Sequence, residues 1–329
     1  MAIYPNPPLG STNTGNLYLA QAAYDRLARF ALRPELYFDN VADVKPTNQS
    51  MPGASVTFPI ISDLAIANSP LNESTDVTPQ SISQSTVTVT LAEYGNSVLT
   101  TAALRGESYV EIDPVVANVI GYNAGVSIDE VARDTLKAGT NVAYTNSKTS
   151  RVQIASTDAL KAADIRAAKA RLRSQNVPNF NGFYTAYIHP NVAYDFTSET
   201  GSAAWRDPHT YSQPGEIWAG ELGAFEGFRF IETPRSPVFQ GAGSSTGTVG
   251  ANVYGTICVG RQSLAKAWSM IDGNTEQPHV VPGPITDYLR RFVPWGWYWL
   301  GGYSIYRQAS VQRIESGSSL TYADPAIDQ

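Results

Sequence analysis

The chain has 329 residues, of which 43% are hydrophobic and only 16% are charged, and its formal net charge is −6 at pH 7. This length is enough to bury a substantial core and suggests about two domains. The acidic balance argues against tight non-specific binding to DNA or anionic membranes, because such binding requires Lys and Arg to displace counterions. No segment reaches the roughly 18 apolar residues of a membrane span, so no membrane partner is expected.

The N-terminal third is predicted to contain a flexible arm followed by a long hairpin. Residues 1–16 are rich in Pro, Gly and Asn, and residues 17–30 have the apolar spacing of an amphipathic helix that Pro34 ends. Alternation of apolar and polar residues predicts strands at 53–61 and 85–91, separated by mostly small and polar residues. A two-stranded hairpin is marginal in water by itself. We therefore expect its tip to lie on another surface, most economically on a neighbouring subunit.

A long helix is predicted after the hairpin. Asp113 and Pro114 form a helix start, with Asp as the cap and Pro in the first turn. Apolar residues then recur at helical spacing until Gly139 closes the helix, which gives a length of about 39 Å. Gly121 and Gly125 either weaken this helix, by about 1 kcal/mol each relative to Ala, or mark close packing against a strand.

The rest of the chain alternates short helices and strands. The expected elements are a loop at 139–157 with a short strand at 152–155, a helix at 158–174, a strand at 184–188, a short helix at 190–197, a strand at 228–232, a flexible loop at 241–250, a strand at 253–259, a short helix at 263–268 and strands within 285–314. The helix at 158–174 is predicted to have an inward face of Leu160, Ile165, Ala168 and Leu172. Trp295, Trp297 and Trp299 share one strand face. The polar tail from Glu315 is predicted to be loose.

The motifs that could carry chemistry are weak. Ser245 lies in a GSSTG sequence that matches a nucleophile elbow, and Asp272 and His279 follow in hydrolase order. A nucleophile elbow needs a strand before it and a helix after it, whereas this sequence lies in a Gly/Ser run, so a loop is favoured. His189 precedes a proline at a strand exit and is predicted to have a turn role. The single Cys258 is predicted to be a small buried hydrophobe. No catalytic, cofactor or metal site is therefore predicted.

Two surface features have a functional and a structural interpretation. The helix at 158–174 carries basic residues that could contact nucleic acid or acidic lipid, but the acidic chain favours a solvated face. These residues are Lys161, Arg166, Lys169, Arg171 and Arg173. The tryptophans of residues 295–299 could form a sugar-binding platform, but core or subunit-interface packing is favoured because aromatic residues dominate both.

Residues 182–237 resemble the axial-domain signature of tailed-bacteriophage major capsid proteins. The strongest part is GELGAFEGFRFIET at 220–233, preceded by YTAYIHPNVAYD at 184–195. The pattern is similar to the N-four-like major capsid protein family, which has the Hong Kong 97-type fold. The resemblance implies an α+β chain with an N-terminal arm at 1–45, an extended hairpin loop at 46–107, a spine helix and peripheral domain at 108–155, an axial domain at 156–275, and return strands of the peripheral domain with a tail at 276–329.

The resemblance also implies a function. Subunits of such proteins form hexamers and pentamers that tile an icosahedral shell around packaged double-stranded DNA, so the expected function is assembly and not an enzyme activity. The expected location is the virion capsid, assembled in the host cytoplasm. Expected partners are other copies of the chain, a portal at one vertex, and a decoration or cement protein. Because almost nothing precedes the arm, a separate scaffolding protein is expected. Candidate inter-subunit ion-pair residues are Arg29, Arg33, Glu216, Glu226 and Arg229.

Three alternatives remain open from the sequence. An encapsulin-like nanocompartment shell shares the expected fold. A β-rich receptor-binding or sugar-binding virion protein would use the tryptophan face, and a serine hydrolase would use Ser245.

Some capsids of the expected fold join subunits by an isopeptide bond from a lysine of the extended loop. Here Lys45 is followed by no lysine until Lys137, so covalent joining through the loop is not expected.

Overall fold

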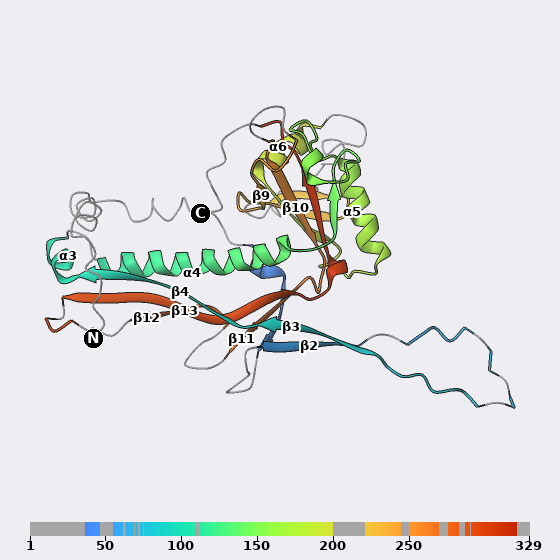
Figure 1. The fold of residues 1–329 in the computed structure, drawn as a ribbon, viewed down its shortest axis with the longest axis horizontal. Helices are drawn as coiled ribbons and strands as arrows, with labels where there is room; N and C mark the ends of the chain where they lie inside the picture. The colour runs from blue at the N-terminus through green and yellow to red at the C-terminus, as the bar shows by residue number, and fades with distance from the viewer. Residues whose placement is uncertain are drawn as a thin grey trace.

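The structure is a computed structural model that describes residues 37–46, 55–61, 64–68, 70–71, 73–74, 76–108, 112–199, 221–244, 250–269, 276–282, 287–289 and 291–320. The predicted arm at 1–16 and the helix at 17–30 lie outside these residues. The described part contains two mixed sheets, one long helix and a projecting hairpin (Figure 1). None of its helices is long and apolar enough to cross a membrane.

The first sheet is long, has five strands and is covered on one face by the long helix. Its order is β1 (Ala42–Pro46), β11 (Leu264–Trp268), β13 (Phe292–Ile305) and β12 (His279–Pro282), with β4 (Ala92–Thr101) paired along β13. Helix α4 (Ile112–Lys137) runs along this sheet (Figure 1). Trp297 and Trp299 are buried against its apolar face, formed by Ile120, Ala124 and Ile128. The predicted tryptophan face is therefore confirmed as core.

The long helix agrees with its prediction at both ends. It starts at Ile112, one residue before the predicted cap, and it ends at Lys137, where Gly139 N–H donates to Leu136 O (3.1 Å). The close-packing interpretation of Gly121 is wrong, because a Cβ added there would meet nothing within 4 Å. A short helix, α3 (Ala102–Glu107), connects β4 toward α4 and is capped by Thr101, whose Oγ1 accepts from Leu104 N–H (3.3 Å).

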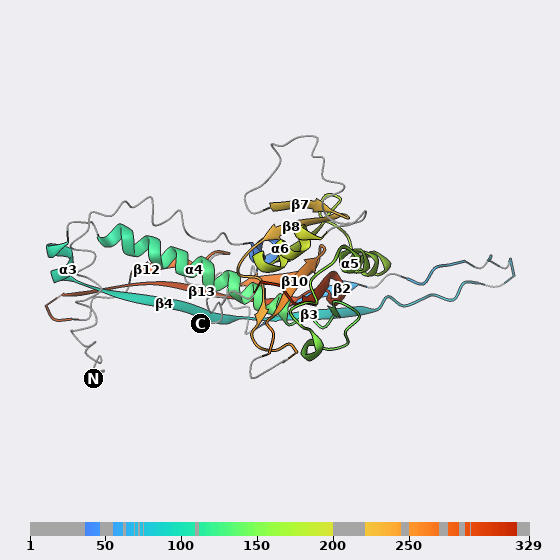
Figure 2. The same cartoon turned by 90° about the horizontal axis from the view of Figure 1, so that it is seen from above.

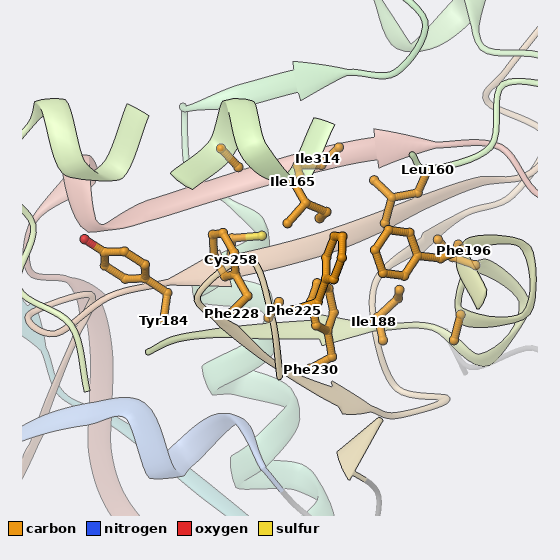
Figure 3. Close-up of a cluster of buried hydrophobic side chains, with 14 of the residues drawn as sticks. Leu160, Ile165, Tyr184, Ile188, Phe196, Phe225, Phe228, Phe230, Cys258 and Ile314 are labelled. Carbon is orange, nitrogen blue, oxygen red and sulfur yellow. The ribbon is translucent and has the colours of Figure 1, made fainter. Parts of the chain in front are cut away.

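The second sheet has seven strands and holds the larger core. Its order is β5 (Val142–Tyr144), β14 (Val311–Ser316), β10 (Val253–Val259), β6 (Tyr184–Ile188), β8 (Phe228–Glu232) and β7 (Glu221–Phe225), with β9 (Val238–Phe239) beside β10. Helices α5 (Ala162–Ser174) and α6 (Pro190–Ser198) pack on it. Figure 3 shows Ile165 of α5 and Phe196 of α6 pointing toward Phe230 of the sheet.

The hairpin is confirmed, with strands β2 (Ser55–Ile61) and β3 (Gln84–Thr90) paired antiparallel from Ser55↔Thr90 to Ile61↔Gln84. Its base is not marginal, which corrects the prediction for that part. Val56, Phe58 and Val89 are buried against β11 of the same chain. Gly302 lets the hairpin cross β13 closely, because a Cβ there would lie 2.1 Å from Thr90 O.

Several predicted elements are corrected. Residues 263–268 form strand β11 and not a helix, and the short strand of the 139–157 loop is β5, whereas 151–153 form the 3-10 turn η2 (Arg151–Gln153). The tail is not loose at its start, because Glu315 and Ser316 are buried in β14. Strand β4 and the 3-10 turn η1 (Phe38–Val41) were not predicted.

The division of the chain into two sheets does not follow the expected domain limits. Strand β11 lies within the expected axial region 156–275 but belongs to the five-stranded sheet. Strand β14 lies within the expected peripheral region 276–329 but belongs to the seven-stranded sheet. A third 3-10 turn, η5 (Gln308–Ser310), lies between β13 and β14, so the chain crosses from one sheet to the other at this point.

Candidate functional surfaces

The hairpin ends in a segment, here called the tongue, that comprises the described residues between 64 and 83. Every one of them is exposed, including large apolar side chains such as Ile66 (88% exposed) and Leu71 (78%). Figures 1 and 2 both show the two limbs extending beyond both sheets. The chain has no Lys or Arg between Lys45 and Arg105. The tongue is therefore an uncharged to acidic surface that contributes nothing to the subunit core.

The base of the N-terminal segment is fixed at the junction of the two sheets. Phe38 N–H donates to Asp129 Oδ1 of α4 (2.7 Å), and Tyr187 Oη of β6 donates to Tyr37 O (3.0 Å). Burial raises the pKa of Asp129, against the opposing effects of the Phe38 hydrogen bond and the Arg235 charge. These contacts join η1 to the long helix and the seven-stranded sheet.

A buried lysine in β11 completes this junction. Lys266 is 1% exposed, and its Nζ lies 2.8 Å from Asp39 Oδ2, while Tyr303 Oη donates to Asp39 Oδ1 (2.6 Å). A cavity of about 310 Å³ adjoins these groups and is lined by Asp39, Asp129, Lys266, the glycines of α4 and Trp297. The charges there neutralise one another within the chain. The sequence signal for this cluster, a lysine within the apolar strand LAKAW, was missed.

A second buried ionic cluster joins the end of α4 to β14. Glu315 is fully buried and accepts from Arg151 Nε (2.8 Å), Arg151 Nη2 (2.7 Å) and Arg313 Nε (2.9 Å). The hydrogen bond to Glu315 raises the pKa of Arg151 above its usual value. Arg313 also donates to Lys137 O at the last turn of the helix. The cluster therefore holds the helix end on the seven-stranded sheet, which is a structural role.

Two of the three residues of the hydrolase alternative, Ser245 and Asp272, lie outside the described residues, so the structure does not test this alternative. The third, His279, lies in β12 of the five-stranded sheet, opposite Tyr298. The described residues contain no group of three His, Cys, Asp or Glu side chains that could hold a metal ion.

Cys258 is buried as predicted, whereas His189, for which a turn role was predicted, caps a helix. His189 Nδ1 accepts from Asn191 N–H (3.2 Å) at the start of α6, so the side chain caps this helix. Cys258 is fully buried in the core of Figure 3, and burial raises the pKa of its thiol to about 12.

The predicted ion-pair residues are only partly described. Glu226 pairs within its own chain, with Arg166 Nε at 2.9 Å and Lys169 Nζ at 3.8 Å, and its inter-subunit contact stays a prediction. The two basic residues come from the predicted basic helix, α5, and tie it to the β7–β8 turn. Arg229 is exposed on β8. Arg29, Arg33 and Glu216 lie outside the described residues.

Two of the three tryptophans of the predicted sugar platform, Trp297 and Trp299, are buried in the core. Trp297 Nε1 donates to Asn123 Oδ1 of α4 (2.9 Å), and Trp299 Nε1 donates to Glu276 O (3.2 Å). Both rings are buried beneath α4, so their faces are not available to a ligand.

A family model described as "Phage capsid protein" matches residues 17–318 of the chain. Among solved structures, the capsid of Ralstonia phage GP4 is similar with a TM-score of 0.75 at 14% identity, covering 98% of this chain and 99% of that one. The capsid of cyanophage P-SCSP1u gives a TM-score of 0.66 at 15% identity, covering 96% and 97%. The acid-stable capsid of Helicobacter pylori bacteriophage KHP30 gives 0.63 at 14% identity, covering 96% and 99%. No curated protein sequence matches the chain.

Proposed function

We propose, from the premise that the chain belongs to the phage capsid protein family, that its copies assemble as hexamers and pentamers into an icosahedral shell. The α+β fold is that of Hong Kong 97-type phage capsid proteins. A coat protein acts through its surfaces, so the proposal depends on what those surfaces offer to other copies.

The single observation that carries the proposal is the tongue. The subunit holds the base of the hairpin in its own core, whereas every described residue of the tongue is exposed. An extended segment that is exposed to water has no burial to offset the entropy of ordering it. Its extended form is explained if it is buried against other copies of the chain, where many modest contacts add through multivalency.

The finer assignments are part of the same proposal. We assign the chain to the N-four-like branch on the signature at 220–233, α4 to the spine helix, and the residue limits 1–45, 46–107, 108–155, 156–275 and 276–329 to the arm, extended loop, spine helix with peripheral domain, axial domain and return strands. Strand β11 lies within 156–275 but belongs to the five-stranded sheet, and β14 lies within 276–329 but belongs to the seven-stranded sheet. The last two residue ranges therefore do not coincide with the division of the chain into sheets.

The proposed partners follow from the function. The shell encloses double-stranded DNA without sequence-specific binding, which agrees with the acidic chain. A portal at one vertex, a separate scaffolding protein and a decoration or cement protein complete the particle. Assembly takes place in the host cytoplasm, and no step requires an enzyme activity of this chain.

Electron microscopy and light scattering of the purified protein test the proposal. We expect closed particles or capsomers, either from the chain alone or with its scaffolding protein. Monomers under all conditions would contradict it. Closed particles that hold a protein cargo and require no portal would instead favour the nanocompartment alternative.

A further inference from the structure

The cavity between α4, η1 and the five-stranded sheet, here called the junction cavity, has the size of a small-ligand site. Its volume is about 310 Å³. An apolar cavity of about 150 Å³ is known to hold a benzene molecule, so there is room here for a molecule of that size or larger. Two of the lining residues, Gly121 of α4 and Val280 of β12, are exposed, so the cavity opens to solvent on their side.

The cavity exists because the face of α4 that covers it carries small residues. Four of its lining residues follow the i, i+3, i+4, i+7 spacing of one helix face, and they are Gly121, Ala124, Gly125 and Ile128. A Cβ added at Gly121 would meet nothing within 4 Å. The first three positions therefore leave space that larger side chains would fill. Ile128 and, from the sheet, Val280 give the space apolar walls.

One end of the cavity holds a buried carboxylate oxygen without a hydrogen bond. Asp129 lines the cavity and is 2% exposed, and only its Oδ1 accepts a hydrogen bond, from Phe38 N–H. Its Oδ2 has no hydrogen-bond partner. Arg235 Nε lies 3.6 Å from this oxygen and also lacks a partner. Because a buried acceptor without a hydrogen bond is costly, a donor placed in the cavity would be bound favourably.

The same end of the cavity holds a buried donor. Lys266 lines the cavity, and Asp39 Oδ2 at 2.8 Å is the one hydrogen-bond acceptor of its Nζ among the described residues. An ammonium group has three N–H groups, so Nζ can also donate to a ligand oxygen. The charges are already balanced, because Lys266 pairs with Asp39 and Arg235 faces Asp129. A charged ligand would bury an unpaired charge, whereas a neutral hydroxyl group both donates and accepts.

We propose that the junction cavity binds a small neutral hydroxyl compound with a short apolar body. Its hydroxyl group donates to Asp129 Oδ2 and accepts from Lys266 Nζ, and its body lies against Ala124, Ile128 and Val280. The site lies within one subunit, so this inference does not depend on the proposed assembly. Because the ligand contacts the helix and the sheet together, it binds the folded subunit and stabilises it.

Titration of the purified chain with four small probes, followed by NMR, tests the chemistry of the site at pH 7. Phenol is neutral at this pH, toluene is its match in size without the hydroxyl group, and benzoate and benzylamine carry opposite charges. We expect phenol to bind about ten- to a hundredfold more tightly than toluene, and more tightly than either ion. Absence of phenol binding would overturn the inference, since the cavity would then hold water only. Equal binding of phenol and toluene would also overturn it, because the polar end would contribute nothing.

A cavity-filling substitution tests the location of the site. Gly121→Leu places a side chain on the cavity face of α4, where a Cβ meets open space, so the subunit should stay folded but lose measurable phenol binding. The matched control is Gly106→Leu in α3, where a Cβ also meets nothing within 4 Å, and it should keep the affinity of the parent. Phenol binding that survives Gly121→Leu, or that both substitutions reduce equally, would overturn the inference. If either variant fails to fold, the four probes on the unmodified chain still decide it.

Discussion

At the residue scale, buried charges fix the junction between the long helix and the seven-stranded sheet. Glu315 has no solvent exposure and is neutralised by Arg151 and Arg313, which come from different parts of the chain. Such a pair contributes little net stability relative to an apolar substitute, but loss of one partner leaves the others buried without a counter-charge. This asymmetry makes the cluster a sensitive probe of the junction.

We expect Glu315→Gln to lower the free energy of unfolding of the subunit by roughly 2–4 kcal/mol. This is less than the largest losses seen when a buried ion pair is broken, because Arg151 is partly exposed and water can solvate its charge. Chemical denaturation of the free subunit measures this change. The matched control is Glu73→Gln on the exposed tongue, which should change stability by less than about 0.5 kcal/mol. Similar effects of the two substitutions would show that the Glu315 cluster has no special structural role.

A second residue-scale prediction concerns pH. Burial acts to raise the pKa of Asp158, but it is outweighed by hydrogen bonds from Ala155 N–H and Asn146 Nδ2 and by the charge of Lys148, so the pKa is lowered below 3.8. A lowered folded-state pKa adds stability above the unfolded-state pKa, and this stability is lost as the pH falls through the folded value. The stabilising effect of Asp158 is therefore complete at neutral pH and disappears in acid.

Asp158→Asn should accordingly be less stable than the parent at pH 6, and the difference should narrow as the pH falls below 3.8. Denaturant unfolding at several pH values measures it. A difference that stays constant down to strongly acidic pH would mean that the carboxylate charge at this position does not contribute.

At the element scale, the hairpin divides into two parts with different roles. The base strands β2 and β3 pack their apolar face on β11, whereas the tongue beyond them buries nothing in its own subunit. Removal of residues 64–83 should therefore leave the circular dichroism and stability of the subunit close to those of the parent, while particles are lost. A deletion that unfolds the subunit, or one that still assembles normally, would contradict this division.

The periodic elements were predictable, and the others were decided by tertiary contacts. The alternation in β3 and the helical spacing of α4 gave their limits to within one or two residues. Strand β11 was taken for a helix because its sequence, LAKAW, contains good helix formers, but pairing with β1 and β13 overrides that propensity. Strand β4 was missed because one of its faces is solvated and Gly95 and Asn96 interrupt its pattern.

The ionic contacts show the same limit of sequence reasoning. Glu226 lies within a strongly recognisable signature, yet its partner Arg166 is 60 residues away and the pair could not be found from spacing. Asp39 and Lys266 are separated by 227 residues and meet only because β1 lies parallel to β11. Pairs of this kind depend on strand order, which local patterns do not determine.

At the scale of the whole molecule, the subunit is two sheets joined by the long helix, with a projecting tongue as its main uncovered element (Figure 2). Any covalent joining of subunits through the tongue would need a neutral lysine amine as nucleophile. The chain offers none there, because no lysine lies between Lys45 and Lys137, and an asparagine amide such as that of Asn68 cannot react alone.

We therefore predict that the shell is held by non-covalent contacts between its subunits and by any added cement protein. Particles boiled in detergent should run as a single band near 35.5 kDa. A ladder that the unmodified chain shows in the presence of reductant would contradict the prediction. It would place the reacting amine at Lys45 or at a lysine outside the hairpin, which single Lys→Arg substitutions would then identify.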